Sequence, residues 1–286
     1  WFNTGFLELQ RIDWSTSARF LEKIIRYEAV HEITSWQDLR GRIDPPDRLC
    51  YAFIHPRLPD DPLIFIEVAL TDETPPAIGP LLAEDRKPLD AERANTAVFY
   101  STSSCQAGLK GISFGSFLIK RVVEEIRREF PTVRTFVTLS PVPGFVSWLE
   151  LDEGSGSSGL LPGDDRTALR RLLIAGWHER TQDLRVLRPL LTDAVARYLL
   201  LARDRAGRLL DPVARFHLGN GALLEQINWL GNLSPKGLAE SAGFMVNYIY
   251  DLSRIERNHE IYAQTGRVLA ARDVRRLLTG RHGTGK

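Results

Sequence analysis

The segment TLSPVPGFVSWL, residues 138–149, places a serine at the end of an apolar run and stiffens the chain that follows it. Pro141 and Pro143 lack a backbone N–H, so neither can continue a central strand, and the strand should stop at about Ser140. A serine hydroxyl on such a rigid loop can accept or relay a proton. A serine before a proline is nevertheless most often a turn residue, so this pattern alone leaves Ser140 structural.

A second segment with chemical potential is the glycine-rich turn QAGLKGISFGSFLIK, residues 106–120, which joins an expected strand to an expected helix. Its glycines let backbone N–H groups approach an anion, and the helix N-terminus adds a partial positive charge, as in a pyrophosphate cradle. The glycine spacing fits neither a Walker loop nor a dinucleotide-binding turn. A plain strand-to-helix turn, with glycines for tight packing, explains the pattern equally well.

The chain contains six histidines, and their number favours none of them. His217 stands out because Asn220, Gly221 and the apolar residues after them predict that it lies on a turn before a helix. The unperturbed pKa of histidine suits proton transfer near neutral pH. Cys105 lies beside the glycine turn and could be a modifiable thiol, but a small core or loop residue is the simpler interpretation.

The hydrophobic pattern predicts the elements that must position these residues. The pattern predicts helices over residues 16–29, from residue 35 and over residues 116–129. It also predicts three strands that begin at residues 49, 63 and 96, and a fourth strand that ends at residue 140. The second half predicts a polar loop over 152–165, a helix over 184–204 and a final strand over 243–250. Pro189 should mark the first turn of that helix or a kink. The layout is α/β, a sheet covered by helices.

Composition excludes several classes of protein. The 286 residues are 43% hydrophobic and 26% charged with a formal net charge of +1, which is typical of a globular protein and does not indicate a nucleic-acid-binding face. No run approaches the ~18 apolar residues of a membrane span. Two cysteines, Cys50 and Cys105, cannot build a disulfide framework or a zinc site, so a reducing compartment is expected.

The chain resembles the malonyl-CoA decarboxylase family from residue 1 to about residue 262. The most specific segments are LSPVPGF at Leu139 and FHLGNGA at Phe216; FYSTSSCQAGLKGI at Phe99 and GFMVNYIY at Gly243 also match. The resemblance implies an α/β (α+β) fold like that of GCN5-related N-acetyltransferases, with a mixed sheet flanked by helices. It implies one catalytic domain over 1–286, with a loop and helical insertion over about 152–210. The N-terminal helical domain of the family is expected to be absent from this chain.

The resemblance also implies a reaction and a site. Malonyl-CoA would lose CO₂ through a thioester enolate to give acetyl-CoA, with Ser140 as proton acceptor and His217 as proton donor. Tyr250 would line the site. The acyl-CoA segment falls on seven consecutive residues: Lys110, Gly111, Ile112, Ser113, Phe114, Gly115 and Ser116. Some relatives have a glutamate at the position of Ser113 that could orient the histidine, so another group or a water must do so here.

Further expectations concern cofactors, partners and location. No metal or organic cofactor is expected, because the thioester carbonyl can itself accept the electrons left by CO₂. The expected partners are malonyl-CoA and acetyl-CoA, with neither nucleic acid nor membrane, and with a homo-oligomer in the full-length protein. A cytoplasmic, bacterial location and a role in fatty acid metabolism are expected. Two alternatives remain open at this point: a CoA-dependent N-acyltransferase, and a non-catalytic acyl-CoA-binding module, neither of which needs the Ser140–His217 pair.

Overall fold

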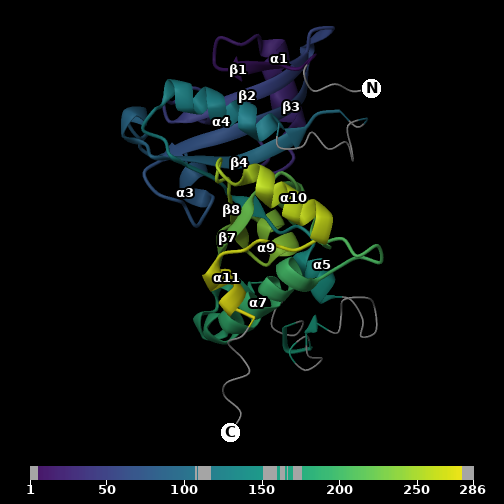
Figure 1. Cartoon of the computed structure of the whole chain (residues 1–286). Helices are drawn as coiled ribbons and strands as arrows, with labels where there is room; N and C mark the ends of the chain where they lie inside the picture. The colour runs from purple at the N-terminus through teal and green to yellow at the C-terminus, as the bar shows by residue number, and fades with distance from the viewer. Residues whose placement is uncertain are drawn as a thin grey trace. The chain divides into compact units, whose positions relative to one another are not determined.

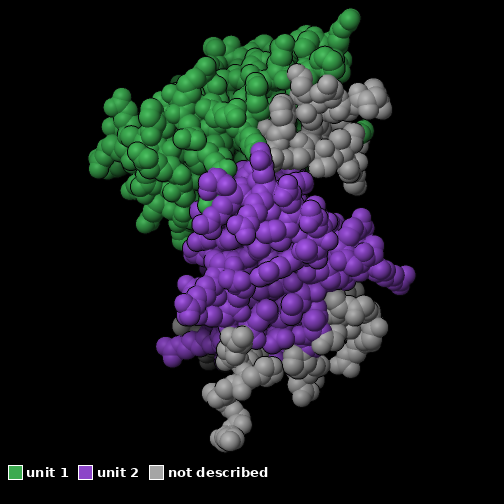
Figure 2. All heavy atoms as spheres, viewed as in Figure 1, with its two compact units in different colours: residues 1–139, 250–252 green, residues 140–249, 253–286 purple. Residues whose placement is uncertain are grey.

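The computed structural model describes residues 6–106, 108, 117–150, 160–161, 165, 167–169 and 176–278 (Figure 1). Contacts within the chain divide it into two compact units (Figure 2). Unit 1 comprises residues 1–139 and 250–252, and unit 2 comprises residues 140–249 and 253–286. Ser140 and His217 therefore belong to the same unit. The single catalytic domain over 1–286 stays a prediction.

Unit 1 is built on strands in the order β1–β2–β3–β4–β5. These strands are β1 (Glu8–Ile12), β2 (Arg48–His55), β3 (Leu58–Thr71), β4 (Thr96–Ser104) and β5 (Thr135–Thr138). The first three pairings are antiparallel, and β4 pairs with β5 in parallel, so the sheet is mixed. The three predicted strand runs are confirmed as β2, β3 and β4. Strand β1 was not predicted, and its residues are mostly exposed or half-buried.

The helices of unit 1 follow local sequence signals. They are α1 (Ala18–Tyr27), α2 (Trp36–Ile43), α3 (Gly79–Leu82), the short 3-10 helix η2 (Ala91–Arg93) and α4 (Phe117–Glu129). The side chain of Ser35 accepts a hydrogen bond from Asp38 N at 3.0 Å, so Ser35 caps the helix that was predicted from residue 35. α1 packs on β3 and α2 packs on β2. α4 makes the connection between the parallel strands β4 and β5, as the strand–helix–strand prediction requires.

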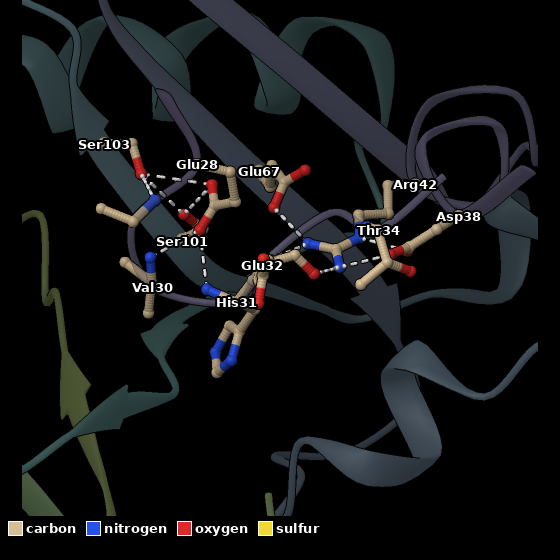
Figure 3. A network of polar contacts seen from close by, with 11 residues as sticks. Glu28, Val30, His31, Glu32, Thr34, Asp38, Arg42, Glu67, Ser101 and Ser103 are labelled. Atoms are coloured by element: carbon tan, nitrogen blue, oxygen red, sulfur yellow. Dashed lines mark hydrogen bonds and ion pairs between the residues drawn. The ribbon is translucent and has the colours of Figure 1, made fainter. Parts of the chain in front are cut away.

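A network of buried polar groups joins α1 to the sheet of unit 1 (Figure 3). The carboxylate of Glu28, at the C-terminus of α1, accepts hydrogen bonds from Val30 N and His31 N, both at 2.8 Å. It also accepts from the hydroxyls of Ser101 at 2.7 Å and Ser103 at 3.2 Å, both on β4. These bonds compensate the carboxylate for its loss of water, because buried polar groups are costly unless they are paired.

Glu67 on β3 is a second buried carboxylate in this network, with no exposed surface. Its Oε2 lies 3.5 Å from Arg42 Nη1 of α2, and Arg42 also donates to the carbonyl oxygens of His31 at 2.7 Å and Glu32 at 2.9 Å. Burial, reinforced by the charge of Glu28, raises the pKa of Glu67 to about 8 although Arg42 opposes the shift. Glu67 should therefore contribute to the pH response of unit 1.

The strands of unit 2 pair antiparallel, β8 with both β6 and β7. Its strands are β6 (Ser140–Pro141), β7 (Leu223–Asn228) and β8 (Met245–Ile249). Its helices are α5 (Phe145–Leu149), the 3-10 helix η5 (Trp177–Glu179), α7 (Thr181–Leu201), α8 (Pro212–Gly219), α9 (Pro235–Ser241), α10 (Ile255–Thr265) and α11 (Arg272–Arg276). The predicted final strand is confirmed as β8. None of the helices that the structure describes combines the length and the hydropathy needed to cross a membrane.

Three sequence predictions for this region need correction. Pro141 forms part of the two-residue strand β6, so pairing extends one residue past Ser140. Pro189 lies well inside α7, not in its first turn, because the helix already begins at Thr181. His217 lies in the last turn of α8, not on a turn before a helix, and strand β7 follows it. The segment after His217 forms a strand because it pairs with β8, a tertiary contact that its sequence does not reveal.

Candidate active site

Ser140 is fixed by backbone pairing on one side and by a short anchored loop on the other. In β6 it pairs with Val246 of β8, and it is only 6% exposed. Between Ser140 and Gly144 the two prolines leave few backbone donors, and the N–H of Val142 donates to the Ser241 hydroxyl of α9 at 3.1 Å. The loop after Ser140 is thus tied to α9.

His217 is positioned by both ends of helix α8. Asp211 caps the N-terminus, where its Oδ1 accepts from Ala214 N at 2.7 Å. At the C-terminus the carbonyl of His217 accepts from Asn220 N at 3.1 Å and Ala222 N at 3.0 Å. Gly221 makes this turn possible: its φ is +83°, and a Cβ there would lie 2.1 Å from the carbonyl oxygen of Ile255. The turn therefore requires a glycine and fixes the end of the helix that carries His217.

The two predicted catalytic side chains meet. Ser140 Oγ lies 3.1 Å from His217 Nε2, although the residues are 77 positions apart in sequence. Both are buried, at 6% and 5% exposure. Either atom can donate in this hydrogen bond, depending on which imidazole nitrogen carries the proton. A hydroxyl and an imidazole in this geometry can pass a proton between them.

The surroundings of His217 favour its neutral form. Its ring stacks on Tyr248 of β8, with ring centroids 4.8 Å apart and planes at 27°. Burial lowers the pKa of His217 to about 3, because the imidazolium loses its hydration in this apolar environment. At neutral pH the free protein therefore holds an uncharged imidazole against Ser140. Tyr248 was not singled out from sequence.

The other residues predicted for the site stay predictions. Tyr250 belongs to unit 1, where its ring lies 6.5 Å from that of Phe99 and its N–H donates to Phe136 O at 2.8 Å. The predicted acyl-CoA segment, residues 110–116, lies outside the described residues. Cys105 is a buried member of the apolar core of unit 1, and burial raises the pKa of its thiol to about 12, so the core interpretation is correct. In the described part of the chain, His, Cys, Asp and Glu side chains form no group of three or more suited to a metal ion.

Comparison with known proteins identifies the family. Residues 5–285 match the family model for the malonyl-CoA decarboxylase C-terminal domain. The chain belongs to the malonyl-CoA decarboxylase family. The crystal structure of malonyl-CoA decarboxylase from Rhodopseudomonas palustris is 57% identical and superposes with a TM-score of 0.91, covering 96% of this chain and 67% of that one. The mitochondrial malonyl-CoA decarboxylase of Anser anser anser is 39% identical over 294 residues, covering 96% of this chain.

The chain spans 58% of the length of the Anser relative, so it corresponds to one part of a longer family member. The fold prediction is confirmed by a more distant neighbour as well. The loading GNATL domain of CurA from Lyngbya majuscula superposes with a TM-score of 0.50 at 13% identity, covering 87% of this chain. This malonyl-CoA decarboxylase family member therefore has the mixed α/β, acetyltransferase-like fold that its sequence predicted. The expected homo-oligomer, cytoplasmic location and absence of cofactors stay predictions.

Proposed function

We propose that this chain converts malonyl-CoA to acetyl-CoA and CO₂, with Ser140 and His217 handling the proton. The observation that carries the proposal is the 3.1 Å contact between Ser140 Oγ and His217 Nε2 in a member of this family. An N-acyltransferase or a passive acyl-CoA-binding module needs no such buried hydroxyl–imidazole pair. The contact therefore favours decarboxylation over both alternatives.

The thioester of the substrate supplies the electron sink. When the carbon–carbon bond to the carboxylate breaks, its electron pair remains on the α-carbon and spreads onto the thioester oxygen as an enolate. A protein then has three tasks: to orient the carboxylate, to stabilise the enolate oxygen, and to deliver one proton to carbon. We infer on these grounds that no metal or organic cofactor takes part.

The pair can deliver that proton as a relay. His217 donates a proton from Nε2 to Ser140 Oγ, and Ser140 passes its own hydroxyl proton to the α-carbon of the enolate. Ser140 is then the proton acceptor and His217 the proton donor. Turnover consumes one proton, because an anionic malonyl group becomes neutral CO₂ and a neutral acetyl group. Since burial holds the pKa of His217 at about 3 in the free protein, the proton has to enter together with the anionic substrate, whose charge favours an imidazolium.

The acyl-CoA segment completes the proposal. We propose that the backbone of residues 110–116 binds the pyrophosphate of CoA and that the α-carbon of the malonyl group meets Ser140. The support is the sequence context of a glycine turn before helix α4 together with membership of the family. Tyr250 stays a predicted lining residue.

The direct test is to incubate the protein with malonyl-CoA alone and to quantify acetyl-CoA and CO₂. A positioned acid or base contributes about 10²–10⁴-fold, so Ser140→Ala and His217→Ala should each lower kcat on that scale. Because the two act as one unit, the double variant should be little slower than the slower single variant. His55→Ala, which removes a histidine from unit 1, is the matched control and should keep normal turnover. A folded His217→Ala protein with near-normal kcat would disprove the assigned roles.

A further inference from the structure

Tyr198, in helix α7, contacts the residue that begins the helix carrying His217. Its hydroxyl donates to Asp211 Oδ2 at 3.4 Å, a long hydrogen bond, while Asp211 Oδ1 caps α8 through Ala214 N. Burial raises the pKa of Asp211 to about 6, which still leaves a carboxylate at neutral pH to accept both bonds. Tyr198 and Asp211 are each 1% exposed, so this contact is sealed from water.

The same hydroxyl also touches the loop that carries Ser140. A Cβ placed on Gly144 would lie 2.4 Å from Tyr198 Oη and 3.5 Å from Tyr198 Cζ. The backbone of Gly144 has φ −97° and ψ 0°, which other residues can adopt, so the backbone conformation does not demand a glycine. The reason for a glycine here is the Tyr198 hydroxyl, which occupies the space that a Cβ would need.

The ring of Tyr198 has little freedom to move away from that contact. It packs against Phe145 and Trp148 of α5, with ring centroids 5.8 Å and 5.4 Å away. α5 begins directly after Gly144, so the same short segment both receives the hydroxyl and holds the ring. A displacement of Tyr198 would therefore shift the Ser140 loop, the start of α8, or both.

We propose that Tyr198 is a positioning residue that sets the separation of Ser140 and His217 by bridging Gly144 and Asp211. The proposal rests on the function proposed above for the pair. Proton transfer across a 3.1 Å contact tolerates little displacement, and active groups have to be held within roughly 0.5 Å of their working geometry. Tyr198 acts through the pair and needs no contact with the substrate.

Three variants test the bridge: Gly144→Ala, Tyr198→Phe, and the two combined. Gly144→Ala should lower kcat at least tenfold, because the new Cβ displaces the hydroxyl, while KM for malonyl-CoA stays within about twofold. Tyr198→Phe should lower kcat by about two- to tenfold, the range expected for one hydrogen bond. In the combined variant the clashing oxygen is gone and the 3.5 Å separation from Cζ is an ordinary contact, so kcat should recover to the level of Tyr198→Phe.

A matched control separates positioning from general loss of stability. Ile24 of α1 is fully buried in the apolar core of unit 1, away from the elements that carry the pair in sequence. Ile24→Ala should therefore cost stability through the cavity it leaves, yet keep kcat within about twofold when measured on folded protein. If Ile24→Ala loses as much kcat as Gly144→Ala, the loss is generic and the proposal is overturned.

A second background distinguishes this proposal from the function on which it rests. In Ser140→Ala protein, Gly144→Ala should change the residual rate by less than twofold, because the pair it positions is already broken. A Ser140→Ala protein with wild-type kcat would refute the proposed function. If Ser140→Ala is slow but Tyr198→Phe turns over at the wild-type rate, the proposed function survives and the positioning role fails. That last comparison decides the question even if Gly144→Ala does not fold.

Discussion

Acidification should destabilise this protein through His217, because the folded and unfolded states bind its proton with different affinity. Burial lowers the pKa of His217 from its ordinary value of 6.5 to about 3. Between pH 6.5 and pH 3, His217 binds a proton in the unfolded chain but not in the folded chain, so the free energy of unfolding falls as the pH falls. The contribution is fully present above about pH 7 and is lost at up to about 1.4 kcal/mol per pH unit below 6.5.

The loss in free energy of unfolding that His217 causes at pH 5 follows from its two pKa values. Integrating the difference in proton binding from pH 8 to pH 5 gives a loss of about 2 kcal/mol from this one side chain. This figure depends mainly on the ordinary pKa of histidine, since any folded pKa below about 4 gives nearly the same result. A loss of this size is a large share of the stability of an ordinary domain.

The assay compares wild type with His217→Gln in chemical denaturation at pH 8 and pH 5. Glutamine cannot titrate, and other groups contribute equally to both proteins. On going from pH 8 to pH 5, the free energy of unfolding of the variant should therefore end about 2 kcal/mol higher, relative to its value at pH 8, than that of wild type. His259→Gln is the control, because His259 is exposed on α10, and its stability should change with pH as that of wild type does. If His217→Gln and wild type lose equal stability, His217 titrates normally, and the argument that it is held neutral against Ser140 is refuted.

Two further predictions concern unit 1 and the acyl-CoA segment. Because burial raises the pKa of Glu67 from 4.5 to about 8, folding takes up a proton between those values, and stability is lost as the pH rises through that window. Chemical denaturation between pH 5 and pH 9 should show that the free energy of unfolding of Glu67→Gln falls less with rising pH than that of wild type. The control Glu92→Gln, at an exposed residue, should behave as wild type does. The same pH dependence in wild type and both variants would contradict the prediction. Gly111→Val should raise KM for malonyl-CoA by blocking the approach of the backbone to the pyrophosphate, with kcat little changed. If the folded variant binds malonyl-CoA with unaltered affinity, residues 110–116 do not bind the pyrophosphate.

The elements that sequence predicted best are those whose signals are local. Helix α1 buries Phe20, Leu21 and Ile24 on one stripe and is capped by Ser17, and both features can be recognised within a dozen residues. Strand β7 is different. Its sequence LLEQIN consists largely of good helix formers, and it is a strand because β8 supplies the partner. Pairing with a strand about twenty residues away cannot be recovered from local propensity.

The buried carboxylates of unit 1 were missed for a related reason. Glu67 interrupts the apolar run IFIEVAL of β3, and an acid inside a fully buried strand is a signal that sequence alone offers. Its partner Arg42 comes from α2, and Glu28, whose charge raises its pKa, comes from the end of α1. Sequence can flag the acid but cannot name its partners, because three separate elements bring them together.

The candidate site likewise combines residues that sequence can identify with contacts that sequence cannot predict. Resemblance to the family pointed to Ser140 and His217, and the structure brings them within hydrogen-bonding distance. Nothing in their spacing predicts that contact, because it depends on β6 and β7 both pairing with β8. Tyr248, also on β8, stacks on His217 for the same reason. The role of Tyr250, the tyrosine chosen from sequence, stays a prediction.

The proline-rich exit from Ser140 can now be explained residue by residue. Pro141 and Pro143 remove two backbone donors that would otherwise need partners in a half-buried loop, and the donor that remains between them, Val142 N–H, is satisfied by Ser241. Gly144 leaves room for the hydroxyl of Tyr198. Each residue type in the loop thus either removes a polar group that could not be paired or makes room for one that is. Another conformation of this loop would break the hydrogen bond of Val142 N–H and the contact at Gly144. That cost favours the conformation in which the Ser140 hydroxyl lies against His217.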